Sequence, residues 1–223
     1  VHGTDVSDGG GRAPASGQDR RQQIVRGAFE ALQERGLPHM SYDVIAEHAG
    51  LTRQLIRYHY PEPDDLMLDL CDMIAAIYRD VLISTAGSLQ GAARVDAFLD
   101  FYFDLLDGTP KPRDDKVYDA MLSLTASSPE LKLRLGEQYR MIGQVLAHEF
   151  AVQYPDLDQQ GAEELSWLFV CLMYGHWKMV AALGYDESHR VISRRAMDRL
   201  IRSYCAEGSD SAARVAVFGR TTA

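Results

Sequence analysis

The side chains best suited to bind a polar ligand are gathered in one short stretch, LTRQLIRYHY, at residues 51–60. Arg53, Gln54 and Arg57 cannot all be buried there, because an unpaired guanidinium group is too costly to remove from water. Exposed on a helix, arginine can donate to O6 and N7 of guanine, and glutamine can pair with adenine. These residue types therefore predict contact with the edges of DNA bases. For each residue alone, a solvated polar face is the alternative.

The neighbouring residues add chemistry suited to phosphate groups. Tyr58 and His59 can donate hydrogen bonds to phosphate from a hydroxyl group and a ring N–H. From residue 48 to residue 61 the chain has two arginines, two histidines and no acid, whereas its net charge is −9. The net charge argues against indiscriminate nucleic-acid binding, which depends on neutralising phosphates. The local cationic stretch still allows a small surface that reads DNA.

Two short helices must hold this stretch in place. Ser41 is a good N-cap for the first helix, Gly50 suits the turn after it, and Thr52 caps the second helix. We include the hydroxyl groups of Ser41 and Thr52 among the candidate DNA contacts. Ala46 is small enough to face a crossing helix. The pattern predicts a helix-turn-helix, with an ordinary pair of bundle helices as the alternative. The apolar residues that would lock the two axes are Ile45, Ala49, Leu51 and Ile56.

The stretch GLPHMSYDVIAEHAGLTRQLIRYHYPEPDDL resembles the DNA-binding domain of the TetR (tetracycline-repressor-like) family of transcriptional regulators. The resemblance covers residues 20–66, and the other 140 or so residues match only in helix count and layout. It implies a DNA-binding regulator rather than an enzyme. The matching positions are Gly36, Ile45-Ala46, Ala49-Gly50, Thr52, Tyr58-His59-Tyr60 and Leu66.

The chain departs from the family pattern at positions that would contact DNA. Where the family commonly has a lysine that touches phosphate, this chain has Pro63 between two acids. Gln54 and Arg57 stand where a small residue and a tyrosine are common. We therefore expect a weaker backbone anchor and an altered base preference. Arg20 and Arg21 could compensate by holding phosphate or entering a minor groove, with a solvated helix start as the alternative.

The whole chain is predicted to be all-α. We expect a disordered arm at 1–18, a helix-turn-helix DNA-binding domain at 19–66, a helical ligand-binding and dimerisation domain at 67–207, and a tail at 208–223. Helical spacing of apolar residues recurs throughout, and no stretch alternates as a strand would. The expected helices cover about 19–35, 41–50, 52–60, 63–84, 92–107, 116–125, 130–153, 159–183 and 188–206.

The last two helices are predicted to form a homodimer. From residue 165 to residue 183 only Ser166, His176 and Lys178 are polar, so the helix must be covered on nearly all sides. A two-fold dimer would present two reading helices to successive major grooves of a palindromic operator. A wholly intramolecular bundle is the alternative. The candidate interface residues are Trp167, Leu168, Leu172, Gly175, Met179, Ile192, Met197, Leu200, Ile201 and Tyr204.

The middle helices could enclose a pocket for a small apolar effector. Tyrosine hydroxyls and methionines supply the polar handles and apolar surface usual in such sites, although plain core packing is the alternative. His176 is expected to be a hydrogen-bonded core residue rather than a metal ligand. The candidate pocket residues are Phe101, Tyr102, Tyr118, Met121, Tyr139, Cys171, Tyr174 and Trp177.

Other functional classes have little support in the sequence. We find no catalytic motif of a hydrolase, metalloprotease or nucleotide-binding enzyme, and expect no cofactor or metal. Three distant cysteines, no signal peptide and no bilayer-length apolar run favour a cytoplasmic protein without a membrane partner. A small-molecule-binding adaptor and an activator-type regulator remain alternatives. We predict a dimeric repressor whose effector changes the spacing of its DNA-reading heads through the helix that begins at Pro63.

Overall fold

A computed structural model of the chain describes residues 16–88, 93–105, 115–186, 188–208 and 217–218. All regular structure within these ranges is helical, so the predicted fold class is confirmed. The long elements are α1 (Gly17–Arg35), α4 (Pro63–Ser88), α7 (Pro129–Gln153), α8 (Gln159–Trp177) and α9 (His189–Glu207). The shorter ones are η1 (Leu37–His39), α2 (Tyr42–Ala49), α3 (Arg53–His59), α5 (Ala93–Tyr102), α6 (Asp115–Leu124) and the π-helical segment η2 (Lys178–Ala182).

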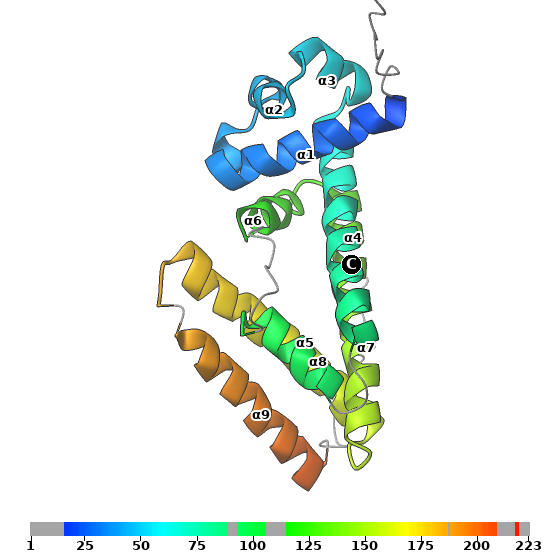
Figure 1. Cartoon of the computed structure of the whole chain (residues 1–223), viewed down its shortest axis with the longest axis vertical. Helices are drawn as coiled ribbons and strands as arrows, with labels where there is room; N and C mark the ends of the chain where they lie inside the picture. Colours follow the sequence, from blue (N-terminus) through cyan, green and yellow to red (C-terminus); the bar gives the residue numbers. More distant parts are fainter. Residues whose placement is uncertain (1–15, 89–92, 106–114, 187, 209–216, 219–223) are drawn as a thin grey trace, which may run out of the picture.

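The molecule is elongated, with α1, α2 and α3 at one end (Figure 1). Helix α4 leads from this end into the larger group of helices, and α8 and α9 lie side by side at the far end (Figure 1). Helix α4 passes without interruption through residues 66 and 67, where we placed the domain boundary, so that boundary stays a prediction. The three N-terminal helices are therefore joined to the rest by a continuous rod.

A close crossing of α1 and α2 fixes the helix-turn-helix. A Cβ atom added to Gly27 would lie 2.7 Å from the Ala49 Cβ and 2.8 Å from the Ala49 backbone nitrogen, so only glycine fits. The Gln23 side-chain amide also donates to the Ala49 carbonyl at 2.7 Å. The apolar stripe of α1 packs into the same core. Its fully buried members are Ile24, Ala28, Ala31 and Leu32.

Tyr60 joins the end of α3 to α1, α2 and α4. Its side chain is fully buried, and its hydroxyl donates to the Asp69 carboxylate on α4 at 2.6 Å. Its carbonyl accepts from the Tyr42 hydroxyl of α2 at 2.7 Å, and the Arg21 guanidinium of α1 lies 4.4 Å from its ring centroid. The orientation of α3 is therefore fixed from three helices.

Several helix ends differ from the sequence prediction, and α4, for example, ends at Ser88 rather than near residue 84. Helix α1 begins at Gly17, because Ser16 and Asp19 form a capping box, so the predicted arm at 1–18 overlaps it. Helix α5 ends at Tyr102 rather than near residue 107, since Asp104 adopts a positive φ of 61°. The α-helical part of α8 ends at Trp177 and continues as a π-helical turn.

Most of both predicted tails lies outside the described residues. Of the C-terminal tail, Phe218 packs on α8, with its ring centroid 5.6 Å from that of Trp167, and lies directly against Gly143 of α7. None of the described helices is both long enough and apolar enough to span a lipid bilayer.

Candidate nucleic-acid interface and ligand pocket

Helix α3 has one buried side and one polar, exposed side, as predicted. Ile56 and Tyr60 are fully buried, whereas Arg53, Gln54 and Arg57 are exposed. The N-terminal start of α3 is capped by Thr52, whose hydroxyl accepts from the Leu55 N–H at 3.3 Å. The guanidinium groups are therefore carried on a short helix whose apolar side is anchored in the core. This orientation allows them to enter a groove of DNA.

The two arginines differ in their surroundings. Arg53 forms an ion pair with Asp43 of α2, at 3.0 Å between Nη1 and Oδ2. Both side chains are more than half exposed, so the pair is weak and a base or phosphate can compete with it. Arg57 forms no ion pair with any residue that the structure describes. Neither arginine is therefore sequestered inside the subunit.

The remaining residues predicted near phosphate lie around the same surface. Tyr58 is 78% exposed, and its ring contacts that of His59 at 5.3 Å between centroids. Ser41 caps α2, and its hydroxyl accepts from the Val44 N–H at 3.3 Å. An accepting hydroxyl still has its own hydrogen to donate to a phosphate oxygen. DNA contact by Ser41, Thr52, Tyr58 and His59 stays a prediction.

Arg21 was expected either to contact DNA or to be solvated at the start of α1, but it forms contacts within the chain instead. Its guanidinium forms an ion pair with Asp69 at 3.0 Å and donates to the His59 carbonyl at 3.4 Å. The hydrogen bond to the Asp69 carboxylate raises the pKa of Arg21, so the guanidinium stays charged. Arg21 thus fastens α1 to α3 and α4. Arg20 instead donates to Gln23 within α1, at 2.8 Å.

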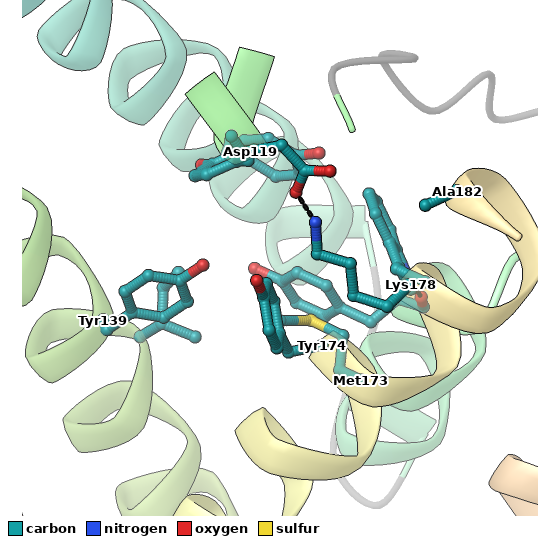
Figure 2. A pocket seen from close by; sticks show the side chains of 11 residues that line it. Asp119, Tyr139, Met173, Tyr174, Lys178 and Ala182 are labelled. Carbon is teal, nitrogen blue, oxygen red and sulfur yellow. Dashed lines mark hydrogen bonds and ion pairs between the residues drawn. The ribbon is translucent and has the colours of Figure 1, made fainter. Parts of the chain in front are cut away.

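A pocket among α4, α5, α6, α7, α8 and η2 is the candidate effector site (Figure 2). It contains about 570 Å³ of space between side chains, part of which opens to solvent. Five tyrosines and a tryptophan form most of its wall, which is predominantly apolar. The lining residues are Tyr78, Tyr102, Tyr118, Asp119, Tyr139, Ile142, Met173, Tyr174, Trp177, Lys178 and Ala182.

The structure brings together five of the eight predicted pocket residues, namely Tyr102, Tyr118, Tyr139, Tyr174 and Trp177. The other three do not line this pocket. Phe101 and Met121 are buried in the core, and Cys171 is exposed. Sequence reasoning also missed Tyr78, although it follows the apolar residues Cys71 and Ile74 of α4 at seven- and four-residue spacing, which was a visible signal.

An ion pair lies along one side of the pocket. Lys178, the first residue of η2, contacts the Asp119 carboxylate of α6, and Tyr139 faces Tyr174 across the cavity (Figure 2). The Lys178 ammonium also lies 5.5 Å from the ring centroid of Tyr174. Burial raises the pKa of the Tyr174 hydroxyl, which is therefore protonated at neutral pH. The pocket thus already holds a cation against an aromatic ring.

Helix α6 connects the pocket to the helix-turn-helix end. It carries Tyr118 and Asp119 on the pocket side, while the Lys116 ammonium donates to the Glu34 carbonyl of α1 at 3.4 Å. Helix α4 makes a second connection, because it carries both Tyr78 in the pocket and Asp69 at the Tyr60 contact. The pocket is therefore joined to α1 and α3 through two helices.

The predicted dimer residues fall into two groups. Trp167, Met179 and Ile192 are 46%, 44% and 63% exposed, and a Cβ at Gly175 would meet no described atom within 4 Å. These residues leave an apolar face on α8 and α9 that a second subunit can cover. The partly buried members of the set are Leu168, Leu172, Leu200 and Tyr204.

The structure corrects the predicted dimer interface at Met197 and Ile201. They are 0% and 4% exposed in the single chain, because this side of α9 packs on α8 of the same subunit. Tyr204 also faces inward, where its hydroxyl donates to Glu164 at 2.9 Å. The burial of Tyr204 and its contact with that carboxylate raise its pKa to about 12. The apolar stripe of α9 is therefore largely used within the subunit.

No family model matches the chain. The HTH-type transcriptional regulator BetI of Escherichia coli is 24% identical over 168 residues, which cover 74% of this chain and 84% of that protein. A TetR transcription regulator from Haloarcula marismortui has a TM-score of 0.71 at 17% identity, covering 83% of this chain and 98% of its own.

A transcriptional regulator from Saccharomonospora viridis, solved in complex with choline, has a TM-score of 0.68 at 19% identity. The match covers 83% of this chain and 96% of that one. At these identities the likeness of the structures establishes the fold. The chain has the fold of TetR-type regulators, with a helix-turn-helix at one end and a helical domain at the other.

Proposed function

We propose that this chain, built on the fold of TetR-type regulators, is a sequence-specific DNA-binding transcriptional regulator. It acts as a ligand-responsive dimeric repressor on a palindromic operator. The observation that carries the proposal is the exposed polar face of α3, with Arg53, Gln54 and Arg57 turned outward and Ile56 and Tyr60 fixed in the core. The sequence similarity to BetI, an HTH-type transcriptional regulator, supports the regulator role.

The arginines of α3 specify the sequence, and the surrounding hydroxyls and backbone position the protein. Arg57 is unpaired among the described residues, so its full set of donors is available to a guanine. Arg53 exchanges its weak contact with Asp43 for a base or phosphate. The acids Glu62, Asp64 and Asp65 at the start of α4 weaken non-specific attraction to phosphate on that side.

Dimerisation places two α3 helices on one side of the assembly. The exposed apolar residues Trp167, Met179 and Ile192 lie on α8, η2 and α9. Helices α8 and α9 belong to the half of the molecule away from α3 (Figure 1). Pairing these faces about a two-fold axis leaves both DNA-reading ends free. An operator with half-sites one helical turn apart, about 34–36 Å, would then match the dimer.

The effector binds in the tyrosine-lined pocket. The choline-bound neighbour from Saccharomonospora viridis makes choline the first compound to test. An effector acts only if it prefers one arrangement of the two DNA-reading ends over the other. From Pro63 to Tyr78 helix α4 rises about 22 Å, at about 1.5 Å per residue, so a small tilt at the pocket moves α3.

The proposal is tested by selecting DNA fragments that bind the purified protein and measuring affinity by fluorescence anisotropy. We expect a palindromic site, two chains per site, and weaker binding when a pocket ligand is added. Arg57→Ala should lose affinity for DNA, whereas Arg202→Ala on α9, which is also exposed but remote from α3, should not. A chain that binds a ligand yet selects no sequence from the pool would instead be a small-molecule adaptor.

A further inference from the structure

We infer that the pocket is a site for a small organic cation, and that the Lys178 ammonium lies in the place that such a cation would take. The inference deepens the proposed function by naming the chemical class of the effector. It concerns binding to the pocket alone, however, and can be tested without DNA. The juxtaposition that carries it is one ammonium, one carboxylate and a wall of aromatic rings.

The aromatic wall favours a positive charge. The face of a tyrosine or tryptophan ring is negative and attracts a cation within about 6 Å of its centroid. The Lys178 ammonium is 5.5 Å from the Tyr174 centroid, so one such contact is already made. Tyr78 and Tyr102 stack at 6.3 Å with nearly parallel rings, which holds two further rings of the wall in fixed positions.

Asp119 is the one acidic residue among those that line the pocket, and it fixes where the charge of a ligand would lie. Its carboxylate contacts the Lys178 ammonium at the edge of the aromatic wall (Figure 2). The two side chains are 36% and 32% exposed, so water screens their attraction. A ligand cation can therefore take the carboxylate, while the flexible lysine chain moves out to solvent.

An anionic ligand fits the same pocket less well. It would gain the Lys178 ammonium but would lie beside Asp119 and against the negative faces of the rings. A cation gains both the carboxylate and the rings. A quaternary ammonium has a further advantage, because its methyl groups suit the apolar wall formed by Ile142 and Met173.

Displacing Lys178 would also release two elements that the ion pair now joins. Lys178 is the first residue of the π-helical segment η2, and π-helical turns are often found at functional sites. Asp119 lies on α6, which reaches α1 through the Lys116 contact to the Glu34 carbonyl. Exchange of the tethered cation for a free one thus removes the ion pair between α6 and η2.

The test compares choline with its neutral carbon isostere, 3,3-dimethylbutan-1-ol, by calorimetry on the full chain without DNA. Tetramethylammonium and benzyltrimethylammonium serve as further cations, and 3,3-dimethylbutyrate as the anion. We expect at least one cation to bind more tightly than both the neutral alcohol and the carboxylate. Absence of binding by every cation to millimolar concentration, or equal binding of the neutral isostere, would overturn the inference.

Two variants separate the roles of the ion pair. Lys178→Met removes the tethered competitor and should tighten cation binding about two- to fivefold, the effect of losing a partly exposed ion pair. Asp119→Asn should weaken cation binding about tenfold and leave the neutral isostere unchanged. Circular dichroism checks that both variants fold.

Tighter binding of the carboxylate, abolished by Lys178→Met, would make the pocket an anion site and contradict the inference. So would weaker cation binding in Lys178→Met. Because these titrations contain no DNA, failure to bind an operator leaves their outcome unaffected. Loss of cation selectivity likewise leaves the DNA-binding proposal standing.

Discussion

Replacing Tyr60 by phenylalanine isolates the contact that fixes α3 to the long helix. The ring stays, and with it the packing in a fully buried site and the Arg21 guanidinium 4.4 Å from its centroid. Only the hydroxyl is removed, which donates to the Asp69 carboxylate at 2.6 Å. The variant therefore measures one hydrogen bond to a charged acceptor.

The expected loss of stability follows from the surroundings of Asp69. Hydrogen bonds to charged groups contribute about 1.5–3 kcal/mol, and the lower end applies here. Asp69 is 39% exposed and keeps its ion pair with Arg21, so water and the guanidinium partly replace the lost donor. A destabilisation of about 1.5 kcal/mol lowers the Tm of a chain of this size by about 3–6 °C.

The pH dependence of stability gives a second readout. Burial, followed by the hydrogen bond to and the charge of Asp69, raises the pKa of Tyr60 well above its ordinary value of 10.0. The protonated hydroxyl therefore contributes stability that is fully present below about pH 10 and is lost as pH rises further. Tyr60→Phe should lose less stability than the unmodified chain between pH 8 and pH 10.5, because it lacks this titration.

Urea unfolding at several pH values measures both effects, with Tyr58→Phe as the matched control. Tyr58 is the same residue type two positions away but is 78% exposed, so its change should stay within about 0.5 kcal/mol. A double-mutant cycle with Asp69→Asn assigns the energy to this pair. Equal stability of Tyr60→Phe and Tyr58→Phe at pH 7, with the same alkaline loss, would refute the assigned contact.

Three further predictions follow from the packing. Gly27→Ala should lower the free energy of unfolding by about 1–2 kcal/mol, even though alanine favours the helix more than glycine does. It should also weaken DNA binding, because α2 must shift to make room for the methyl group. An unchanged denaturation midpoint would argue against the close crossing of α1 and α2. Ile192→Glu should dissociate the dimer in sedimentation without unfolding the subunit, because Ile192 is exposed. Ile201→Ala should lower the free energy of unfolding by about 3 kcal/mol, because Ile201 is buried within the subunit. The reverse pattern would contradict the assigned faces of α9. Arg194→Met should lower the free energy of unfolding by about 2 kcal/mol, because three partly exposed aspartates lose their partner. The exposed control Arg195→Met should change it by no more than about 0.5 kcal/mol. Equal shifts of the two variants in thermal unfolding would show that the ion pairs of Arg194 are not stabilising.

Local chemistry made the caps and turns around α3 predictable. The hydroxyls of Ser41 and Thr52 accept from backbone N–H groups three residues ahead, as their residue types and positions indicate. Gly50 adopts the left-handed conformation at φ 63°, which ends α2. The exposure of Arg57 also follows locally, because no neighbouring position in the sequence offers a buried partner.

Contacts between distant residues were not predictable in the same way. Arg21 finds its carboxylate 48 residues further along, on a helix whose placement no short-range pattern reveals. Lys178 was visible as an isolated polar residue on an apolar helix. Its partner Asp119, however, is supplied by a separate helix, so the charged side of the pocket emerged only from the fold.

The apolar stripe of α9 shows a second limit of prediction from the sequence. Helical spacing indicates which side of a helix is covered, but not whether its own subunit or a second one covers it. Met197 and Ile201 pack within the chain, whereas Ile192 is 63% exposed. Likewise, Phe101 and Tyr102 are adjacent aromatic residues of similar burial, and only the direction of each side chain decides which one lines the pocket.

Base-specific contact by α3 is tested most directly by measuring Arg57→Ala on the selected operator and on sites with single-base changes. We predict a loss of about tenfold to a hundredfold on the operator, and no further loss when the guanine that Arg57 reads is replaced. Binding to unrelated DNA should change far less. An Arg57→Ala protein that still distinguishes every base of the operator as well as the unmodified chain would contradict the assignment of α3 as the reading helix.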